Sequence, residues 1–309
     1  MNAFAPRPGQ PWKLRDDLTL LLAPNPSPMT FLGTNSYILG RDRLVVIDPG
    51  PDDPAHLDAL LLLISGRPVD YILVTHSHLD HSALAPALAA RTRAPVAAFG
   101  DAIAGRSAVM AGLAARGLTD GGEGIDHHFR PDLTLADGDQ LQGDWGAITA
   151  IHSPGHIGNH LCFGWRDALF CGDHVMGWAS SLVSPPDGDL TDFMASCRKL
   201  TTLPATVFYP GHGAPVTDPQ ARLHWLIHHR QAREAQIRAA LTTGPATPQT
   251  LTARIYTDVA PHLVPAAQRN VLAHLIDLAQ RGEVSAAPAP GETAVFSLRD
   301  ASGPAMTRN

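Results

Sequence analysis

The sequence predicts an α/β fold that is followed by a small helical domain. Two observations support this prediction. Over the first two-thirds of the chain, short apolar runs such as LVVIDPG (44–50) and VDYILVTH (69–76) alternate with helical patterns, as expected for buried strands joined by helices. After residue 218 the pattern changes to amphipathic helices. We therefore expect two domains, over residues 1–218 and 219–309.

The elements of the first domain follow one another in a regular order. HLDALLLLIS (56–65) has a helical pattern, the strand at 69–76 comes next, and ALAPALAARTR (83–93) predicts another helix. Three later segments again place polar residues at the end of an apolar run: AITAIHSPGH, HLCFGWRDALFCGDH and ATVFYPGHG. In α/β enzymes, chemistry is carried by loops at the ends of rigid strands. SSLVSPPDGDLTD (180–192) is interpreted as a surface loop.

The second domain begins with a long amphipathic helix, predicted over residues 218–241. A linker, TTGPATPQT, leads to two further helical patterns at 251–259 and 264–285, the second closed near Gly282. VSAAPAPGETAVFSLRD (284–300) fits two short strands around a Pro/Gly-rich turn. Two helices followed by a hairpin are the outline of a small winged-helix domain.

Composition and charge exclude several classes of protein. There is neither an apolar leader segment nor a run of the ~20 apolar residues that a membrane span needs, so we expect a cytoplasmic protein without a membrane partner. The net charge of −6 gives no overall attraction for nucleic acid. The three cysteines, Cys162, Cys171 and Cys197, form no CxxC pair, which favours small buried side chains over disulfides.

The unusual count is 16 histidines against 23 Lys plus Arg, and several of them cluster. THSHLDHS (75–82) places His76 and His78 at the end of a predicted strand, where side chains two positions apart share a face. Asp80 and His81 follow at the start of a helix. Imidazole nitrogen and carboxylate oxygen are ligands of zinc, so the turn can present ligands to two neighbouring ions. Candidates for the remaining ligands stand at later strand ends: His156, Asp173 and His212.

The ordered set VVIDPG, THSHLDH, SPGH, GD and PGHG, over roughly residues 30–215, resembles the five motifs of the metallo-β-lactamase superfamily. This resemblance implies a four-layer αββα sandwich with a two-metal site at one edge of its sheets, and it makes residues 1–218 the catalytic domain. It assigns His76, His78 and His156 to the first metal, Asp80, His81 and His212 to the second, and Asp173 to a bridging position. Asp48 would hydrogen-bond and fix the ligand loop without binding metal, although a turn-capping Asp is an equal alternative.

Two zinc ions in such a site can share a hydroxide, lower the pKa of its parent water and polarise the substrate oxygen. Asp80 and Asp173 are accordingly the expected catalytic carboxylates. Because Asp173 stands where many zinc β-lactamases have a cysteine, and Cys171 lies two residues too early, we do not expect antibiotic hydrolysis. Glyoxalase II-like thioesterases, lactonases, phosphodiesterases and metallo-nucleases all resemble the ligand set. We expect an ester, thioester or lactone as the small-molecule substrate. Iron or manganese also suits a mixed nitrogen and oxygen site.

A second resemblance, carried by TNSYILG, YPGHGAPVTDP and HHRQAREAQI, is to the β-lactamase-like protein 2 group. It implies a winged-helix-like C-terminal domain, and it makes single-strand RNA cleavage the alternative function. The residues themselves do not favour nucleic acid, because positions 248–300 carry four arginines and five acidic residues. Contacts within a homodimer, or a cover over the active site, are alternatives for this domain.

Some candidates have weaker support. His160 and His174 lie near the assigned ligands in sequence, so we consider them for substrate contact, with hydrogen-bonded structural histidines as the alternative. Trp178 is a candidate for the wall of a substrate pocket, with a core position as the alternative. The arginines of the long helix could bind phosphate, but we expect a solvated face paired with acidic neighbours: Arg222, Arg230, Arg233 and Arg238.

Overall fold

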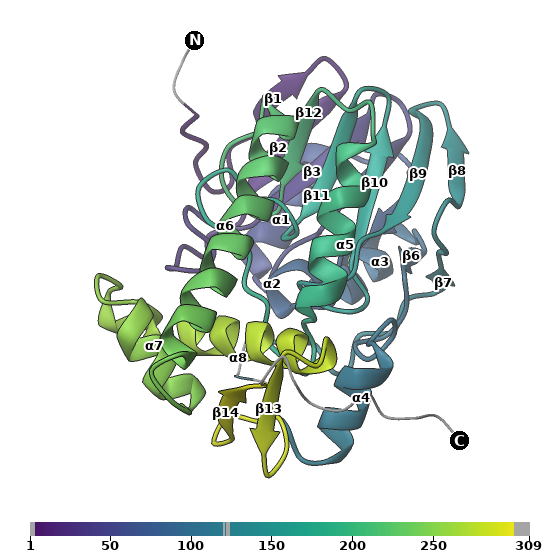
Figure 1. Cartoon of the computed structure of the whole chain (residues 1–309). Helices are drawn as coiled ribbons and strands as arrows, with labels where there is room; N and C mark the ends of the chain where they lie inside the picture. Colours follow the sequence, from purple (N-terminus) through teal and green to yellow (C-terminus); the bar gives the residue numbers. More distant parts are fainter. Residues whose placement is uncertain (1–3, 120, 122–123, 300–309) are drawn as a thin grey trace.

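A computed structural model describes residues 4–119, 121 and 124–299. Two β-sheets lie face to face (Figure 1). The first has seven strands in sequence order: β1 (Trp12–Arg15), β2 (Leu18–Leu22), β3 (Asn35–Gly40), β4 (Leu44–Ile47), β5 (Val69–Leu73), β6 (Val96–Ala98) and β7 (Leu133–Thr134). The second has the order β12-β11-β10-β9-β8: β8 (Gln140–Gly143), β9 (Gly146–His152), β10 (Leu161–Trp165), β11 (Ala168–Gly172) and β12 (Val207–Pro210).

Three apolar layers hold the sandwich together. The central layer lies between the sheets and contains side chains such as Leu20 and Ile47 from one sheet and Phe163 from the other. Helices α1 (Pro54–Ile64) and α3 (Ala85–Thr92) cover the outer face of the first sheet. Helices α5 (Leu190–Thr201) and α6 (Pro219–Leu241) cover the second. This arrangement confirms the predicted four-layer αββα sandwich.

The predicted winged-helix domain follows the sandwich. It consists of α7 (Pro248–Ile255), a short 3-10 helix η1 (Pro261–Leu263), α8 (Val264–Gln280) and the hairpin of β13 (Val284–Ala287) and β14 (Val295–Leu298). Its core also takes Met110 and Leu113 from α4 (Ala108–Ala115), which belongs to the first part of the chain. The domain is thus packed on the sandwich.

Helix α6 belongs to both parts. Leu223 and Leu226, near its start, pack on the second sheet, whereas Ile237 and Leu241, near its end, pack in the winged-helix core. One continuous helix therefore fixes the C-terminal domain against the sandwich. Among the residues that the structure describes, no helix combines the length and the apolar character that crossing a membrane requires.

The prediction of a surface loop at 180–192 is wrong. Residues 183–190 are buried, and Leu190 already begins α5, whose N-cap Asp189 accepts a hydrogen bond from the Thr191 amide. Proline, glycine, serine and aspartate indicate an irregular segment, but they do not determine whether that segment is buried or exposed. Here the Ser181 carbonyl accepts a hydrogen bond from Arg230, the Leu182 carbonyl contacts His156 Nδ1, and the Ser184 carbonyl accepts from the Gly188 amide. Hydrogen bonds of this kind make the burial of backbone tolerable.

Candidate metal centre

The polar motifs follow the carboxyl ends of strands from both sheets. Strand β5 leads into His76 and His78, while the short helix α2 (Leu79–Ser82) carries Asp80 and His81. His156 lies in the loop after β9, Asp173 follows β11, and His212 follows β12. An isolated bridge between Thr34 and His212 joins the two sheets at this edge. The seven candidate ligands, far apart in sequence, therefore meet in one place.

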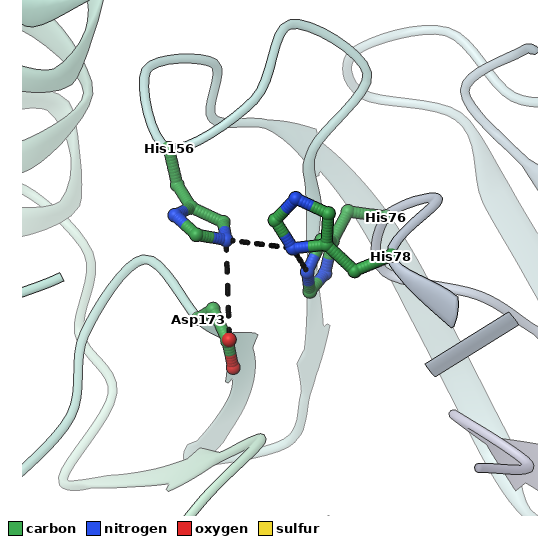
Figure 2. A group of neighbouring side chains, drawn as sticks. All are labelled: His76, His78, His156 and Asp173. Atoms are coloured by element: carbon green, nitrogen blue, oxygen red, sulfur yellow. Dashed lines mark hydrogen bonds and ion pairs between the residues drawn. The ribbon is translucent and has the colours of Figure 1, made fainter. Parts of the chain in front are cut away.

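One group consists of His76, His78, His156 and Asp173 (Figure 2). His78 Nδ1 lies 3.0 Å from His76 Nε2 and 3.1 Å from His156 Nε2. His156 Nε2 is in turn 3.9 Å from Asp173 Oδ2. Ring nitrogens thus point toward a common centre, and all four residues are buried.

A second group, Asp80, His81 and His212, adjoins the first. Asp80 Oδ2 lies 3.5 Å from His81 Nε2 and 3.3 Å from His212 Nε2. Asp173 reaches this group as well, because its Oδ1 is 3.4 Å from His81 Nε2 and its Oδ2 is 3.2 Å from His212 Nε2. The carboxylate of Asp173 therefore stands between the two groups.

Three of the imidazoles are oriented by a contact at the ring nitrogen that faces away from the centre of the cluster. His76 Nδ1 lies 2.9 Å from Thr75 Oγ1, His156 Nδ1 lies 2.7 Å from the Leu182 carbonyl oxygen, and His212 Nδ1 lies 3.2 Å from the Gly33 carbonyl oxygen. Such contacts select the tautomer that leaves the other nitrogen free to bind a metal. The Leu182 contact comes from the segment that the sequence misplaced at the surface.

Asp48 lies outside both groups and holds the ligand loop. Its Oδ1 accepts a hydrogen bond from the Thr75 amide at 2.7 Å, and its Oδ2 accepts one from the Thr75 hydroxyl at 2.8 Å. The same Oδ2 lies 2.9 Å from His81 Nδ1. The backbone of Asp48 has φ +51°, a left-handed conformation that is uncommon for a residue with a side chain. Three contacts to the loop offset the cost of that conformation.

The electrostatics differ between the two groups. Burial, with the neighbouring His156, lowers the pKa of His78 to about 3, and burial also lowers the pKa of His156. Burial opposes protonation of His212, but Asp173 and Asp80 outweigh it and raise its pKa to about 9. In the first group the imidazoles are therefore neutral. In the second, a protonated histidine balances the carboxylates.

This chemistry fits divalent cations. Metals bind neutral imidazole and ionised carboxylate, and a cation can supply the positive charge that otherwise comes from a protonated histidine. His81 Nε2 and Asp173 Oδ1 are buried and have no hydrogen-bond partner among the described residues, although they face each other at 3.4 Å. Buried polar atoms left in this way require an explanation, and a bound cation provides one.

Comparison with known proteins decides the family. Residues 29–212 match the model of the metallo-beta-lactamase superfamily, and residues 247–290 match that of the beta-lactamase associated winged helix domain. The chain belongs to the metallo-beta-lactamase superfamily. It is therefore a hydrolase of that superfamily with a His/Asp cluster suited to metal, and both resemblances drawn from its motifs are confirmed.

Individual relatives extend this superfamily assignment along the chain. Lactamase-like protein aptB of Emericella nidulans is 29% identical over 74% of this chain and 67% of its own. A beta-lactamase-like protein 2 homolog of Caenorhabditis elegans is 29% identical over 88% of this chain and 87% of its own. The crystal structure of a metallo-beta-lactamase family protein from Thermus thermophilus is 26% identical, with a TM-score of 0.73 over 93% of this chain and 100% of that one.

A cavity of about 550 Å³ opens onto the cluster of this superfamily member. Its floor includes His78, Asp80 and His212. Residues of the winged-helix domain, among them Arg269 and Glu292, form part of its wall. Arg269 is an ion-pair partner of Glu292 and donates to Ser184 Oγ at 2.7 Å. The C-terminal domain therefore contributes to the wall of the cavity that opens onto the cluster.

Of the three weaker candidates, His160 and His174 lie away from the cavity, whereas Trp178 lies beside the site. His160 and His174 are fully buried and do not line the cavity. His160 Nδ1 lies 2.9 Å from Ser153 Oγ, and the His174 ring packs on Phe193. Substrate contact fits neither position, because neither ring reaches the cavity. Trp178 is 38% exposed and stacks on an aromatic neighbour beside the site.

Thr34 is a side chain that touches the cluster and that the sequence did not identify. Thr34 donates a hydrogen bond from Oγ1 to Asp80 Oδ2 at 3.0 Å, and Asn25 in turn donates to Thr34 Oγ1 at 2.9 Å. The only signal was the polar pair at the start of TNSYILG, directly before a strand. That segment supported a family resemblance, but it gave no reason to pair Thr34 with Asp80.

Proposed function

We propose that this protein is a dinuclear metal-dependent hydrolase, with zinc as the first candidate metal, that cleaves an ester, thioester or lactone. The observation that carries the proposal is the position of Asp173. Its two oxygens approach His81, His156 and His212, so one carboxylate serves both groups of ligand-type side chains. A separation of about 3.5 to 4 Å between two metals is characteristic of such shared sites.

In this proposal His76, His78 and His156 would hold one ion, Asp80, His81 and His212 would hold the other, and Asp173 would contribute to both sites. Bound divalent cations would lower the pKa of water and polarise a carbonyl oxygen. The chain itself keeps the ligands oriented through Asp48 and Thr75. Asp80, which accepts from Thr34, is oriented in the same way.

The cysteines support hydrolysis that needs no thiol nucleophile. All three are free and buried, as the sequence predicted. Burial raises the pKa of Cys162 to about 12 and that of Cys197 to about 12. These thiols are therefore protonated near neutral pH, whereas a nucleophilic cysteine must be a thiolate.

Single-strand RNA cleavage is the weaker candidate. The relation to beta-lactamase-like protein 2 homologs supports it, but the charges of the winged-helix domain do not. Arg269 pairs with Glu292, and Arg281 pairs with Glu234 and Asp277. An arginine that is paired with a carboxylate attracts the phosphates of a nucleic acid less strongly than an unpaired one.

The test combines metal analysis with a panel of p-nitrophenyl esters, thioesters and lactones, together with unstructured RNA. We expect two bound metals per chain, and carbonyl hydrolysis that is lost on chelation and restored by added zinc. The Asp173→Ala variant should lose this activity, whereas Asp144→Ala, which changes an exposed turn, should keep it. Full activity in metal-free protein would refute the proposal. RNA cleavage without carbonyl hydrolysis would support the second candidate.

A further inference from the structure

Three arginines of α6 have no carboxylate partner among the residues that the structure describes. Arg222 donates to the backbone oxygens of Met176 and Ala179. Arg230 donates to Asn270 Oδ1 at 2.8 Å and to the Ser181 carbonyl.

Arg233 donates to Gln236 Oε1 at 2.9 Å. By contrast, Arg238 on the same helix pairs with Glu234 and Glu283. The prediction of a solvated, acid-paired face therefore fits Arg238 and is wrong for Arg230, which is buried.

Arg230 is the extreme case, because it is only 2% exposed. Its Nε has no hydrogen-bond partner in the described part of the chain, and burial lowers its pKa to about 10. Burial and the charges of Arg230, Arg233 and Arg222 also lower the pKa of the neighbouring His229 to about 4. A buried charge without a counter-charge is costly. The region therefore has a positive potential that an anion would relieve.

Arg230 and Arg233 border a second cavity, of about 280 Å³. We call it the arginine pocket and define it by Arg230 and Arg233 at its polar side, with an apolar wall formed by Trp178, Val259, Leu263 and Met176. It adjoins the cavity over the metal centre, because both are lined by four residues: Met29, Met176, Leu182 and Ala266. A molecule extending away from the cluster would therefore meet an apolar stretch and then a positive charge.

Arg233 has the geometry to bind an anion directly. Its guanidinium lies 4.4 Å from the centre of the Tyr256 ring, which supports it on one face. Among the described residues its guanidinium donates to Gln236, so most of its five N–H donors remain for a ligand. Arg230 has already given hydrogen bonds to Asn270 and Ser181, so its contribution is charge.

We propose that the arginine pocket binds an apolar acyl group that ends in a carboxylate, while the scissile carbonyl of the same molecule lies at the metal centre. This inference rests on the proposed function and names its substrate class. The carboxylate lies at Arg233, within the field of Arg230. The apolar part of the acyl group covers Met176 and Trp178.

The test compares two series of p-nitrophenyl esters of increasing chain length on the metal-loaded protein. One series ends in a methyl group, and the other ends in a carboxylate. We expect a higher kcat/KM for the carboxylate series at the chain length that spans the two cavities. Arg233→Gln should lower that value about ten- to hundredfold, mainly through KM, since it removes a hydrogen bond to a charged group.

Two further variants test whether the preference for carboxylate-ended esters depends on Arg233 itself. Arg233→Lys should retain part of the preference, because it keeps the charge and loses the planar fork. Arg238→Gln is the matched control on the same helix, and it should leave the preference intact. With methyl-ended esters, Arg238→Gln should react as the wild type does.

Equal kcat/KM for the two series, or an unchanged preference in Arg233→Gln, would overturn the inference while leaving the proposed function standing. If no ester is hydrolysed, the proposed function fails, and the pocket is then tested by calorimetry with free half-esters of dicarboxylic acids. Binding that is lost in Arg233→Gln and retained in Arg238→Gln supports the pocket. RNA cleavage that falls in Arg233→Gln while ester selectivity stays constant would contradict it.

Discussion

Asp48 shows how a residue that binds no metal can control the cluster. It contacts the backbone and hydroxyl of Thr75 and the ring of His81, and Thr75 in turn contacts His76. One carboxylate therefore orients a candidate ligand from each of the two groups. The motif VVIDPG indicated that Asp48 follows a buried strand, but its left-handed backbone conformation became visible only in the structure.

We predict that Asp48→Asn lowers metal affinity about 10- to 100-fold, because residues that orient metal ligands have effects of this size. The amide keeps the shape of the side chain but loses the charge beside His81. Competition with a chromophoric chelator measures the change. Asp70→Asn, which alters an ion pair with Arg43 far from the cluster, is the control. Unchanged affinity in Asp48→Asn would rule out this positioning role.

At the scale of elements, the ends of strands from two sheets must approach closely to form one site. Gly211, after β12, permits this approach. A β-carbon there would meet Asp173 Oδ1 and would lie 2.6 Å from His81 Cε1. The Gly211 carbonyl also accepts the Asn35 amide of β3, so its backbone cannot withdraw freely.

Gly211→Ala is expected to displace the Asp173 carboxylate and so to weaken metal binding, and to lower the free energy of unfolding by about 1–3 kcal/mol, the usual cost of overpacking. Metal titration followed by calorimetry measures this loss. In the control, Gly112→Ala in α4, the nearest atom to the new carbon is 3.4 Å away on Arg116. That change should leave metal binding intact. A Gly211→Ala protein with wild-type affinity would show that the strand end can move.

Elements with strong periodicity were predictable from the sequence, and irregular ones were not. The helix predicted at 218–241 is α6 (Pro219–Leu241), and the pattern at 264–285 contains α8 (Val264–Gln280). Apolar spacing reports such helices directly. The segment at 180–192 was misplaced because its composition indicates a loop, and loops usually lie at the surface. Its burial depends on α5, α6 and α8, which surround it only in the folded chain.

At the scale of the whole molecule, the cluster is a concentration of buried polar groups at the edge of an otherwise apolar sandwich. His76, His81 and His212 are 0–1% exposed. Without a cation, the carboxylates of this region must be balanced by protonated histidine, and burial opposes that protonation. Binding of metal to the native state alone stabilises it by mass action.

Metal removal should therefore lower the thermal midpoint. At a free metal concentration of about 1,000 times Kd the stabilisation is about 4 kcal/mol, which corresponds to roughly 6 °C in a protein of this size. Calorimetry before and after dialysis against a chelator measures the shift, and added zinc should reverse it. The same treatment should move the midpoint of Asp173→Ala much less. Equal midpoints with and without metal would contradict a cluster that binds cations tightly.

The candidate ligands were predictable from the sequence, whereas the side chains of the neighbouring arginine pocket were not. Ordered motifs at strand ends identified His156, Asp173 and His212 as partners of the histidine-rich turn, and the structure brings all three together. The inward turn of Arg230 was not predictable, because the rotation of α6 is set by its packing on two separate cores. A local pattern of arginines carries no information about that rotation.

The candidate metal ligands and the charged residues of the arginine pocket come from separate parts of the chain. The candidate metal ligands all lie between His76 and His212, whereas the charged side of the arginine pocket comes from α6, which begins at Pro219. If the arginine pocket binds substrate as proposed, substitutions after residue 218 change which molecules are accepted without altering the candidate metal ligands. Descendants of such a chain can acquire new substrates while they inherit the same bond-breaking chemistry.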